Sequence, residues 1–232
     1  MKAFRPPVEG RKVRFALAGC GRIAQNHFDA IARHSADAEL VDVCDIRPEA
    51  LEAARHKTGA RGHTDFSSML AHTDADCVVL TTPSGLHPRQ AIEAAKAGFD
   101  VMTEKPMATR WSDGLAMVRA CDEAGARLFV VKQNRRNPTL QLLKRAVSSG
   151  RFGRLYMVNV NVFWTRPQAY YDSADWRGTW EFDGGAFMNQ ASHYVDLLDW
   201  LIGPIESLQS YTATLARNIE RSEEHTSDSS HT

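Results

Sequence analysis

The stretch Gly19-Cys20-Gly21-Arg22-Ile23-Ala24 decides the fold of the first half of this chain. It follows a short apolar run, residues 13–18, and opens a segment whose apolar residues recur at helical spacing. A GxGxxA stretch in that setting is typical of a dinucleotide-binding unit. Gly19 then permits a tight turn, Gly21 lets the backbone approach a pyrophosphate, and Ala24 keeps the helix close to the sheet. The start of the helix, with Arg22 and Ile23, supplies N–H groups for the phosphates.

An acidic residue, Asp45, ends the next expected strand, 39–44. A carboxylate there would accept hydrogen bonds from the ribose hydroxyls of NAD and repel the 2′-phosphate of NADP. NAD is therefore the expected cofactor, although Arg47 could offset this preference. The alternative is that Asp45 only caps the helix that begins at Pro48.

Working outward, short strands alternate with amphipathic helices as far as residue 131. Strands are expected at 13–18, 39–44, 77–81, 101–103 and 128–131, and helices at 23–31, from Pro48, from Asp65, at 88–97 and at 112–124. Pro48 and Pro88 suit a first helical turn, and Gly98 and Gly125 suit helix C-termini. This alternation predicts an α/β fold, a Rossmann-type doubly wound parallel sheet, over residues 1–134.

The pattern changes in residues 135–220. A helix at 139–148 is followed by an alternating strand at 156–164, a helix at 185–201 and a second alternating strand at 205–214. This order predicts an incomplete α+β domain with an open, mostly antiparallel sheet, whose unpaired edge would be prone to association. Residues 221–232 (RSEEHTSDSSHT) have no hydrophobic periodicity and resemble the translation of a sequencing adapter. We expect them to be a non-native tail on a C-terminally truncated protein.

Composition excludes several classes of function. The 232 residues carry 28 Lys+Arg and 28 Asp+Glu, so a basic surface for nucleic acid is not expected. The apolar runs are too short to cross a bilayer, and the polar start of the chain is no signal peptide. Four cysteines lie far apart and the histidines show no ligand spacing, so we expect no metal site and a reducing, cytoplasmic location.

Three further motifs follow along the chain, the first two directly after expected strands and the third on the helix expected at 185–201. They are TTPSGLHP at 81–88, Glu104-Lys105-Pro106, and GGAFMNQASHYVDLLD at 184–199. Together with the glycine loop, and in this order, they resemble the Gfo/Idh/MocA family of NAD(P)-dependent sugar oxidoreductases. The resemblance covers about residues 12–220. It implies that cofactor contacts also come from Thr81, Thr82, Pro83, Leu86, His87, Glu104 and Lys105.

The resemblance also implies two catalytic residues. Lys105 would donate to the substrate hydroxyl and stabilise its developing alkoxide, and its peptide bond to Pro106 is commonly cis in the family. His193 matches the histidine of the family's Asp-x-x-x-His pattern and suits a general base. Asn189 stands where the family carries the acid; its amide can hydrogen-bond a substrate but cannot titrate. The alternatives are a surface lysine in a turn and a histidine held by core packing.

Within the family, the chain resembles most the members that oxidise C3 of UDP-N-acetylglucosaminuronate in the biosynthesis of surface-polysaccharide sugars such as those of lipopolysaccharide. The resemblance lies in KQNRRN at 132–137, FWTRPQ at 163–168, Tyr170-Tyr171, WRGTW at 176–180 and Asn189. Arginines suit the carboxylate and two phosphates of such a substrate. The expected substrate contacts are Gln133, Arg135, Arg136, Arg166, Tyr171, Arg177, Asn189 and His193.

Two alternatives remain at this stage: a dehydrogenase of a free polyol or sugar, similar to inositol dehydrogenases, and a non-catalytic NAD-binding sensor. The presence of both Lys105 and His193 counts against a sensor. Some relatives use 2-oxoglutarate to reoxidise tightly held NADH, so this co-substrate is a further expectation. The family also implies a homo-oligomer.

Overall fold

The computed structural model describes residues 3–220. The chain divides into two compact units, Met1–Val131 and Lys132–Thr232, and each is considered by itself. The segment 221–232, which we expected to be a non-native tail, lies outside the described residues.

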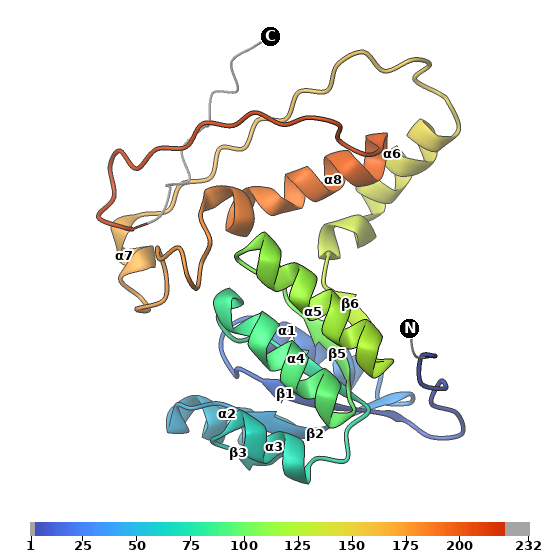
Figure 1. The fold of residues 1–232 in the computed structure, drawn as a ribbon, viewed down its shortest axis with the longest axis vertical. Coiled ribbons are helices and arrows are strands. Elements are labelled where there is room, and N and C mark those ends of the chain that lie inside the picture. The colour runs from blue at the N-terminus through green and yellow to red at the C-terminus, as the bar shows by residue number, and fades with distance from the viewer. Residues whose placement is uncertain (1–2, 221–232) are drawn as a thin grey trace. The chain divides into compact units, whose positions relative to one another are not determined.

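The first unit is built on six parallel strands in the order β3-β2-β1-β4-β5-β6 (Figure 1). Their bounds are β1 Val13–Ala18, β2 Ala38–Cys44, β3 Arg61–His63, β4 Cys77–Leu80, β5 Asp100–Thr103 and β6 Leu128–Val130. The chain runs outward from β1 to β3 and then returns to place β4 beside β1. In open α/β sheets, ligands bind at the carboxyl ends of the strands where the order reverses in this way. The fold thus puts the loops after β1 and β4 at the expected binding edge.

Helices cover both faces of this sheet, as Figure 1 shows. They are α1 Ala24–Arg33, α2 Pro48–Thr58, α3 Phe66–His72, the short 3-10 helix η1 Ser84–Leu86, α4 His87–Ala97 and α5 Trp111–Ala124. Alternate residues of a strand point to opposite faces. Val78 accordingly packs in one core cluster with Met69 and Met117, from α3 and α5, whereas Val79 packs in the other with Phe28 and Leu51, from α1 and α2. The predicted doubly wound sheet is confirmed.

The expected helix ends are also confirmed. Pro48 and Pro88 lie in the first turn of α2 and α4. Gly98 and Gly125 end α4 and α5 in the left-handed conformation, at φ +104° and +67°. Strand β3 was missed because Arg61-Gly62-His63 contains no apolar side chain and forms the outer edge of the sheet.

The second unit is helical in the residues that the structure describes. Its elements are η2 Gln133–Arg136, α6 Pro138–Ser148, α7 Gln168–Tyr171, the π-helix η3 Phe187–Ala191 and α8 Ser192–Ile202. The last two replace the single helix expected at 185–201. Helices α6 and α8 pack together, and Lys144 Nζ donates to the carbonyl of Trp200 at 2.6 Å.

The strands expected at 156–164 and 205–214 are not formed in this structure. Both segments lack regular backbone pairing, and most of the alternating side chains of the first are exposed, with Val158 at 47% and Val160 at 42%. Alternation indicates an extended chain with two unlike faces, but a strand also needs a neighbour to hydrogen-bond with, and two strands alone are marginal in water. The described residues of this unit thus contain none of the strands that the alternating pattern predicts.

Within residues 3–220, no helix is both long and apolar enough to cross a membrane.

Candidate cofactor and substrate sites

Gly19 lies where the loops after β1 and β4 touch. Its φ is +92°, and a Cβ atom there would lie 2.7 Å from the Thr81 carbonyl carbon and from the Thr82 amide nitrogen. The Thr81 hydroxyl lies 2.6 Å from the Gly19 carbonyl oxygen and 3.0 Å from that of Ala18, and it donates to them. Glycine is thus required both by its conformation and by the close approach of the two loops.

The start of α1 is open to an anion. A Cβ atom at Gly21 would have only Arg47 Nη2 within reach, at 4.0 Å. The N-cap residue, Ile23, makes no side-chain cap, and the first turn holds no acidic residue. Unpaired N–H groups and the helix dipole favour a phosphate at such a position. The predicted cradle of Gly19, Gly21, Arg22 and Ile23 therefore fits a pyrophosphate, while Ala24 is fully buried beneath it.

Asp45 is buried and held by two backbone donors. Its Oδ2 accepts from the Cys20 amide at 2.7 Å, and its Oδ1 accepts from the Arg47 amide at 2.8 Å. A carboxylate has about four lone-pair sites, so these bonds fix its direction and leave capacity for ribose hydroxyls. Arg47 Nε lies 3.5 Å from Oδ1, and its side chain is 64% exposed. This geometry fits the predicted adenosine-ribose acceptor.

The loops after β4 and β5 are tied together by a histidine. Thr81 is buried, and Thr82 bonds through its hydroxyl to Gln90 Oε1 at 2.5 Å. His87, which we expected to contact the cofactor, is 0% exposed. Its Nε2 lies 2.9 Å from the Thr82 carbonyl oxygen and its Nδ1 lies 2.9 Å from that of Pro106. The ring thus faces protein rather than an open surface. Pro83 directly precedes η1 and Leu86 ends it, and both are half-buried.

Lys105 follows β5 at the same edge of the sheet and is half-buried. Its peptide bond to Pro106 is cis, which confirms the expectation. Glu104, just before it, is buried, and its carboxylate reaches two partners that sequence reasoning missed. Oε1 lies 2.9 Å from His27 Nε2 on α1, and Oε2 accepts from the Lys105 amide at 3.2 Å. Only the helical spacing of His27 after the glycine loop could have indicated this contact.

The second unit places His193 in the first turn of α8, directly after the π-helix η3, and buries it to 7% exposure. π-turns inside helices occur often at functional sites. Asn189, within η3, donates through Nδ2 to the carboxylate of Asp183. Asp183 is 0% exposed and also accepts from the Gly178 amide at 2.9 Å. Sequence reasoning missed Asp183 because nothing in its local pattern marks a buried carboxylate.

Arg135 has a protein partner. It makes two bonds to Asp196 on α8, Nε to Oδ2 at 2.9 Å and Nη2 to Oδ1 at 2.7 Å, and this hydrogen bonding raises the pKa of Arg135. Lys132 Nζ lies 3.8 Å from the same carboxylate, and burial lowers the pKa of Lys132 despite that charge. Arg135 therefore keeps only part of its guanidinium for a substrate. Gln133 and Arg136 are exposed on η2.

Arg166 and Arg177 share one aromatic ring. Their guanidinium carbons lie 5.1 and 4.3 Å from the centroid of Tyr170, and each also contacts a tryptophan, Trp164 at 5.4 Å or Trp176 at 4.7 Å. Within residues 3–220 neither guanidinium forms an ion pair, and the buried Nε of each has no hydrogen-bond acceptor. Two cations are thus held side by side against aromatic rings, and Arg166 Nη1 also donates to the Thr165 carbonyl at 3.4 Å. An anion would neutralise them.

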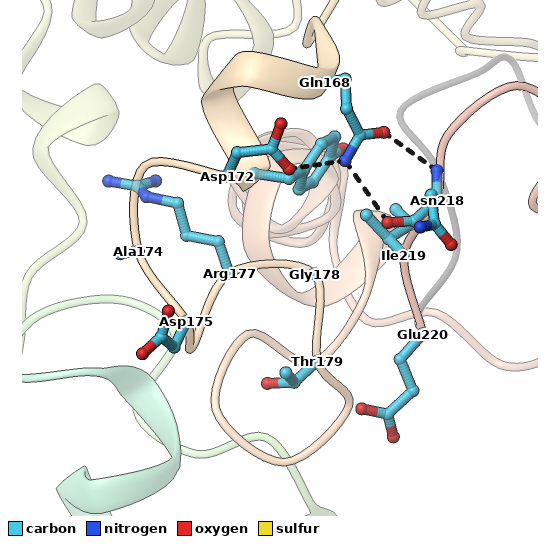
Figure 2. Close-up of a pocket in the computed structure, with 11 residues that line it drawn as sticks. Gln168, Asp172, Ala174, Asp175, Arg177, Gly178, Thr179, Asn218, Ile219 and Glu220 are labelled. Carbon is cyan, nitrogen blue, oxygen red and sulfur yellow. Dashed lines mark hydrogen bonds between the residues drawn. The ribbon is translucent and has the colours of Figure 1, made fainter.

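A separate cavity of about 300 Å³ lies beside α7. Figure 2 shows Gln168 and Asn218 joined across one wall, where the Asn218 amide donates to Gln168 Oε1 at 2.9 Å. Three carboxylates line the cavity, those of Asp172, Asp175 and Glu220, and the Arg177 side chain points away from Glu220. Such a lining does not suit an anionic ligand.

Tyr171, which we expected to contact substrate, is only 4% exposed. It packs edge-on against Tyr170 with ring centroids 5.3 Å apart, and it also lines this cavity. Its ring is therefore buried inside the unit rather than presented on a surface.

In the described part of the chain no three His, Cys, Asp or Glu side chains gather to hold a metal ion. The four cysteines are buried free thiols, and burial raises the pKa of Cys20, Cys44 and Cys77 to about 12. These thiols are structural in character.

The first unit has the fold and the glycine loop of an NAD-binding domain, and the chain belongs to the Gfo/Idh/MocA family. Residues 13–132 match the model described as the oxidoreductase family with an NAD-binding Rossmann fold. Residues 140–231 match the GFO/IDH/MocA C-terminal domain. The second match overlaps the segment 221–232 that we expected to be non-native.

Among solved structures, the chain is similar to the WlbA dehydrogenase of Chromobacterium violaceum, in complex with NADH and UDP-GlcNAcA, at 74% identity and a TM-score of 0.92. That match covers 94% of this chain and 63% of the other. The WlbA dehydrogenase of Bordetella pertussis, with the same two ligands, is 69% identical at a TM-score of 0.91, over 93% of this chain and 65% of the other.

A curated relative, the inositol 2-dehydrogenase of Rhizobium meliloti, is more distant. It is 31% identical over 90% of this chain and 60% of its own length. The chain thus spans about three fifths of the length of this relative and under two thirds of the two WlbA structures.

Proposed function

We propose that this protein oxidises the C3 hydroxyl of a UDP-N-acetylglucosaminuronate-type nucleotide sugar in the formation of surface-polysaccharide sugars. The observation that carries the proposal is the pair Arg166 and Arg177, whose guanidinium groups both lie against the Tyr170 ring. Neither group has a carboxylate partner in the described residues. A nucleotide-sugar uronate offers a diphosphate and a carboxylate, which suit such a pair. A free polyol offers no charge to it. The two WlbA structures with UDP-GlcNAcA support the same substrate class.

The residues of this chain divide the work as follows. The glycine loop and Asp45 hold the dinucleotide, and NAD, when bound, accepts the hydride from C3. Lys105 donates a hydrogen bond to the C3 oxygen and stabilises the charge that develops there. His193 removes the hydroxyl proton as general base. Asn189, turned by Asp183, orients the sugar by hydrogen bonding and does not titrate.

Arg166→Ala and Arg177→Ala test this function. Losing one charge-assisted hydrogen bond costs about 1.5–3 kcal/mol, so KM for the UDP-sugar uronate should rise roughly 10- to 100-fold. The dissociation constant for NAD should not change. Arg154→Ala is the matched control, because Arg154 also lies over a ring, that of Tyr156 at 5.2 Å, outside this pair. Unchanged KM in both variants would contradict the substrate class.

Three companion assays separate the competing functions. Lys105→Ala and His193→Ala should each lower turnover by orders of magnitude and leave NAD binding intact, whereas a sensor would show no turnover to lose. Equal activity on free polyols would favour the inositol-type alternative. We also propose 2-oxoglutarate as the oxidant that recycles NADH: reduced nucleotide should stay below one equivalent per chain without it, and product should exceed that amount with it.

We further propose that the protein assembles as a homo-oligomer. Large apolar side chains along the two unpaired segments support this, among them Tyr156 at 84%, Phe163 at 80% and Leu208 at 78% exposure. Sedimentation velocity of the whole protein measures it directly, and a purely monomeric species would contradict it.

A further inference from the structure

We propose that His27 and His87 are positioning residues for Lys105, because each holds one of the two residues that flank Lys105 in the chain. His27 acts through the Glu104 carboxylate and His87 through the Pro106 carbonyl. The inference rests on the proposed function, in which Lys105 stabilises the reacting oxygen. It concerns two histidines that contact neither substrate nor nicotinamide in that scheme.

The link from His27 passes through both oxygens of one carboxylate. His27 Nε2 lies 2.9 Å from Glu104 Oε1, and Glu104 Oε2 accepts from the Lys105 amide at 3.2 Å. The side chains of His27 and Glu104 are only 14% and 11% exposed, so water competes little for these bonds. Because a carboxylate only accepts, His27 must donate from Nε2. Helix α1, which opens at the glycine loop, is thereby fastened to the backbone of Lys105.

The link from His87 passes through the interior. Its ring joins the carbonyl oxygens of Thr82 and Pro106, each at 2.9 Å, and has no exposed surface. Thr82 in turn packs beneath Gly19. The ring therefore packs between the loop after β4 and the residue that follows Lys105, and in its neutral form it donates to one of the two carbonyls. A shift of about 1 Å in a reacting group can cost roughly 100-fold in rate, which is why such a connection matters.

The proton count makes His27 the better residue to test. Both partners of His87 are carbonyl oxygens, and a neutral imidazole carries only one N–H. Burial lowers the pKa of His87, against the opposing effects of the two carbonyls and Glu104, so its neutral form is favoured. The neutral His87 can therefore donate to only one of its two carbonyl partners, whereas the single N–H that His27 needs for Glu104 is matched by an acceptor. In addition, a substitution at the fully buried His87 would disturb packing.

The experiment compares His27→Ala with His27→Gln, whose amide can still donate at this reach. For His27→Ala, kcat should fall about 10- to 100-fold, while KM and the NAD dissociation constant stay within about twofold. His27→Gln should recover most of kcat. The double variant His27→Ala, Glu104→Ala should be no slower than Glu104→Ala alone, because both changes break one link. His34→Ala is the matched control, since His34 is exposed at the end of the same helix.

Amide hydrogen exchange of Lys105 gives a second readout that needs no substrate. Freed from His27, the Glu104 carboxylate should hold the Lys105 amide less firmly, so exchange at Lys105 should quicken in His27→Ala and not in His27→Gln or His34→Ala. Unchanged exchange in His27→Ala, or an unchanged kcat, overturns the inference. If Lys105→Ala retains full activity, it is the proposed role of Lys105 that fails. The exchange rates then still decide whether His27 holds the turn.

Discussion

Replacing Gly19 by alanine would test the contact that joins the two loops at the binding edge. The new methyl group meets two obstacles. The backbone at φ +92° disfavours any side chain, and the Cβ atom would lie 2.7 Å from backbone atoms of Thr81 and Thr82. Backbone atoms of a buried loop cannot move aside as the tip of a flexible side chain can. Either the loops separate, or the glycine loop changes shape.

The cost divides into two parts that a control can separate. A left-handed conformation costs a non-glycine residue about 1–2 kcal/mol. Forcing a methyl group into a filled space adds roughly 1–3 kcal/mol. Gly98 is the matched control, because its φ is +104° and a Cβ there would meet nothing within 4 Å. Gly98→Ala should therefore show only the first cost, and Gly19→Ala should show both.

The cysteines provide a probe of the first unit alone. All four lie in that unit as buried thiols, and burial raises the pKa of three of them to about 12, so they react slowly until the unit unfolds. Thiol labelling counted by mass across a urea series then gives its unfolding midpoint. With a slope of about 1–3 kcal/mol per molar urea, the two variants should differ by roughly 1 M.

Equal midpoints for Gly19→Ala and Gly98→Ala would refute the reasoning, because the loop contact would then add nothing to the backbone cost. NAD affinity gives an independent check. NAD affinity should fall in Gly19→Ala, where the glycine loop is displaced. It should remain unchanged in Gly98→Ala, because Gly98 lies at the C-terminal end of α4, away from the binding edge of the sheet.

Two further outcomes follow from buried carboxylates. Asp42 is 0% exposed, and although burial raises its pKa, hydrogen bonds from Thr73, His63 and Arg61 outweigh this and lower it. Its contribution to stability is therefore full above the unfolded pKa of about 3.9 and is lost as the pH falls through the lower folded value. Asp42→Asn should lose about 1–3 kcal/mol at pH 7 and flatten the acid limb of the thiol-labelling profile. Asp29→Asn, at an exposed pair with Lys57, should do much less. In the second unit, Asp183→Ala leaves the Gly178 and Asn189 donors without their acceptor, so tryptophan fluorescence in urea should show a loss of about 2–4 kcal/mol. A stability equal to wild type would contradict the assigned bonds.

The fold of the first unit could be predicted because its rules are local. Strand–helix alternation, proline in first turns and glycine at C-termini each depend on a few neighbouring residues, and they placed β1, β2, β4, β5 and β6 within about a residue of their bounds. The prediction for the second unit was less accurate because strands depend on pairing. The alternation in 156–164 indicates a segment with two unlike faces, but whether it forms a strand depends on a hydrogen-bonding neighbour from a distant part of the sequence.

The site shows the same division. The glycine loop, Asp45 and Lys105 each lie in a motif that directly follows an expected strand, so their place in the fold could be predicted. The structure places all three at one edge of one sheet. The bonds of His27 to Glu104 and of Asp183 to Asn189 have no such motif, since each joins residues whose pairing arises only on folding. Arg135 illustrates the converse case. Residue type suggested a substrate ligand, while the structure gives it Asp196 as a partner.

The bond between Asp183 and Asn189 has a consequence for redesign. An aspartate at position 189 would place a second carboxylate against a buried one, and two such groups must share a proton rather than ionise together. Asn189→Asp alone would therefore not recreate the family's acid in working form; it would create a coupled dyad with its own titration. Positions 183 and 189 must therefore be changed together: a working acid at position 189 requires that the carboxylate of Asp183 be replaced by a neutral side chain in the same variant.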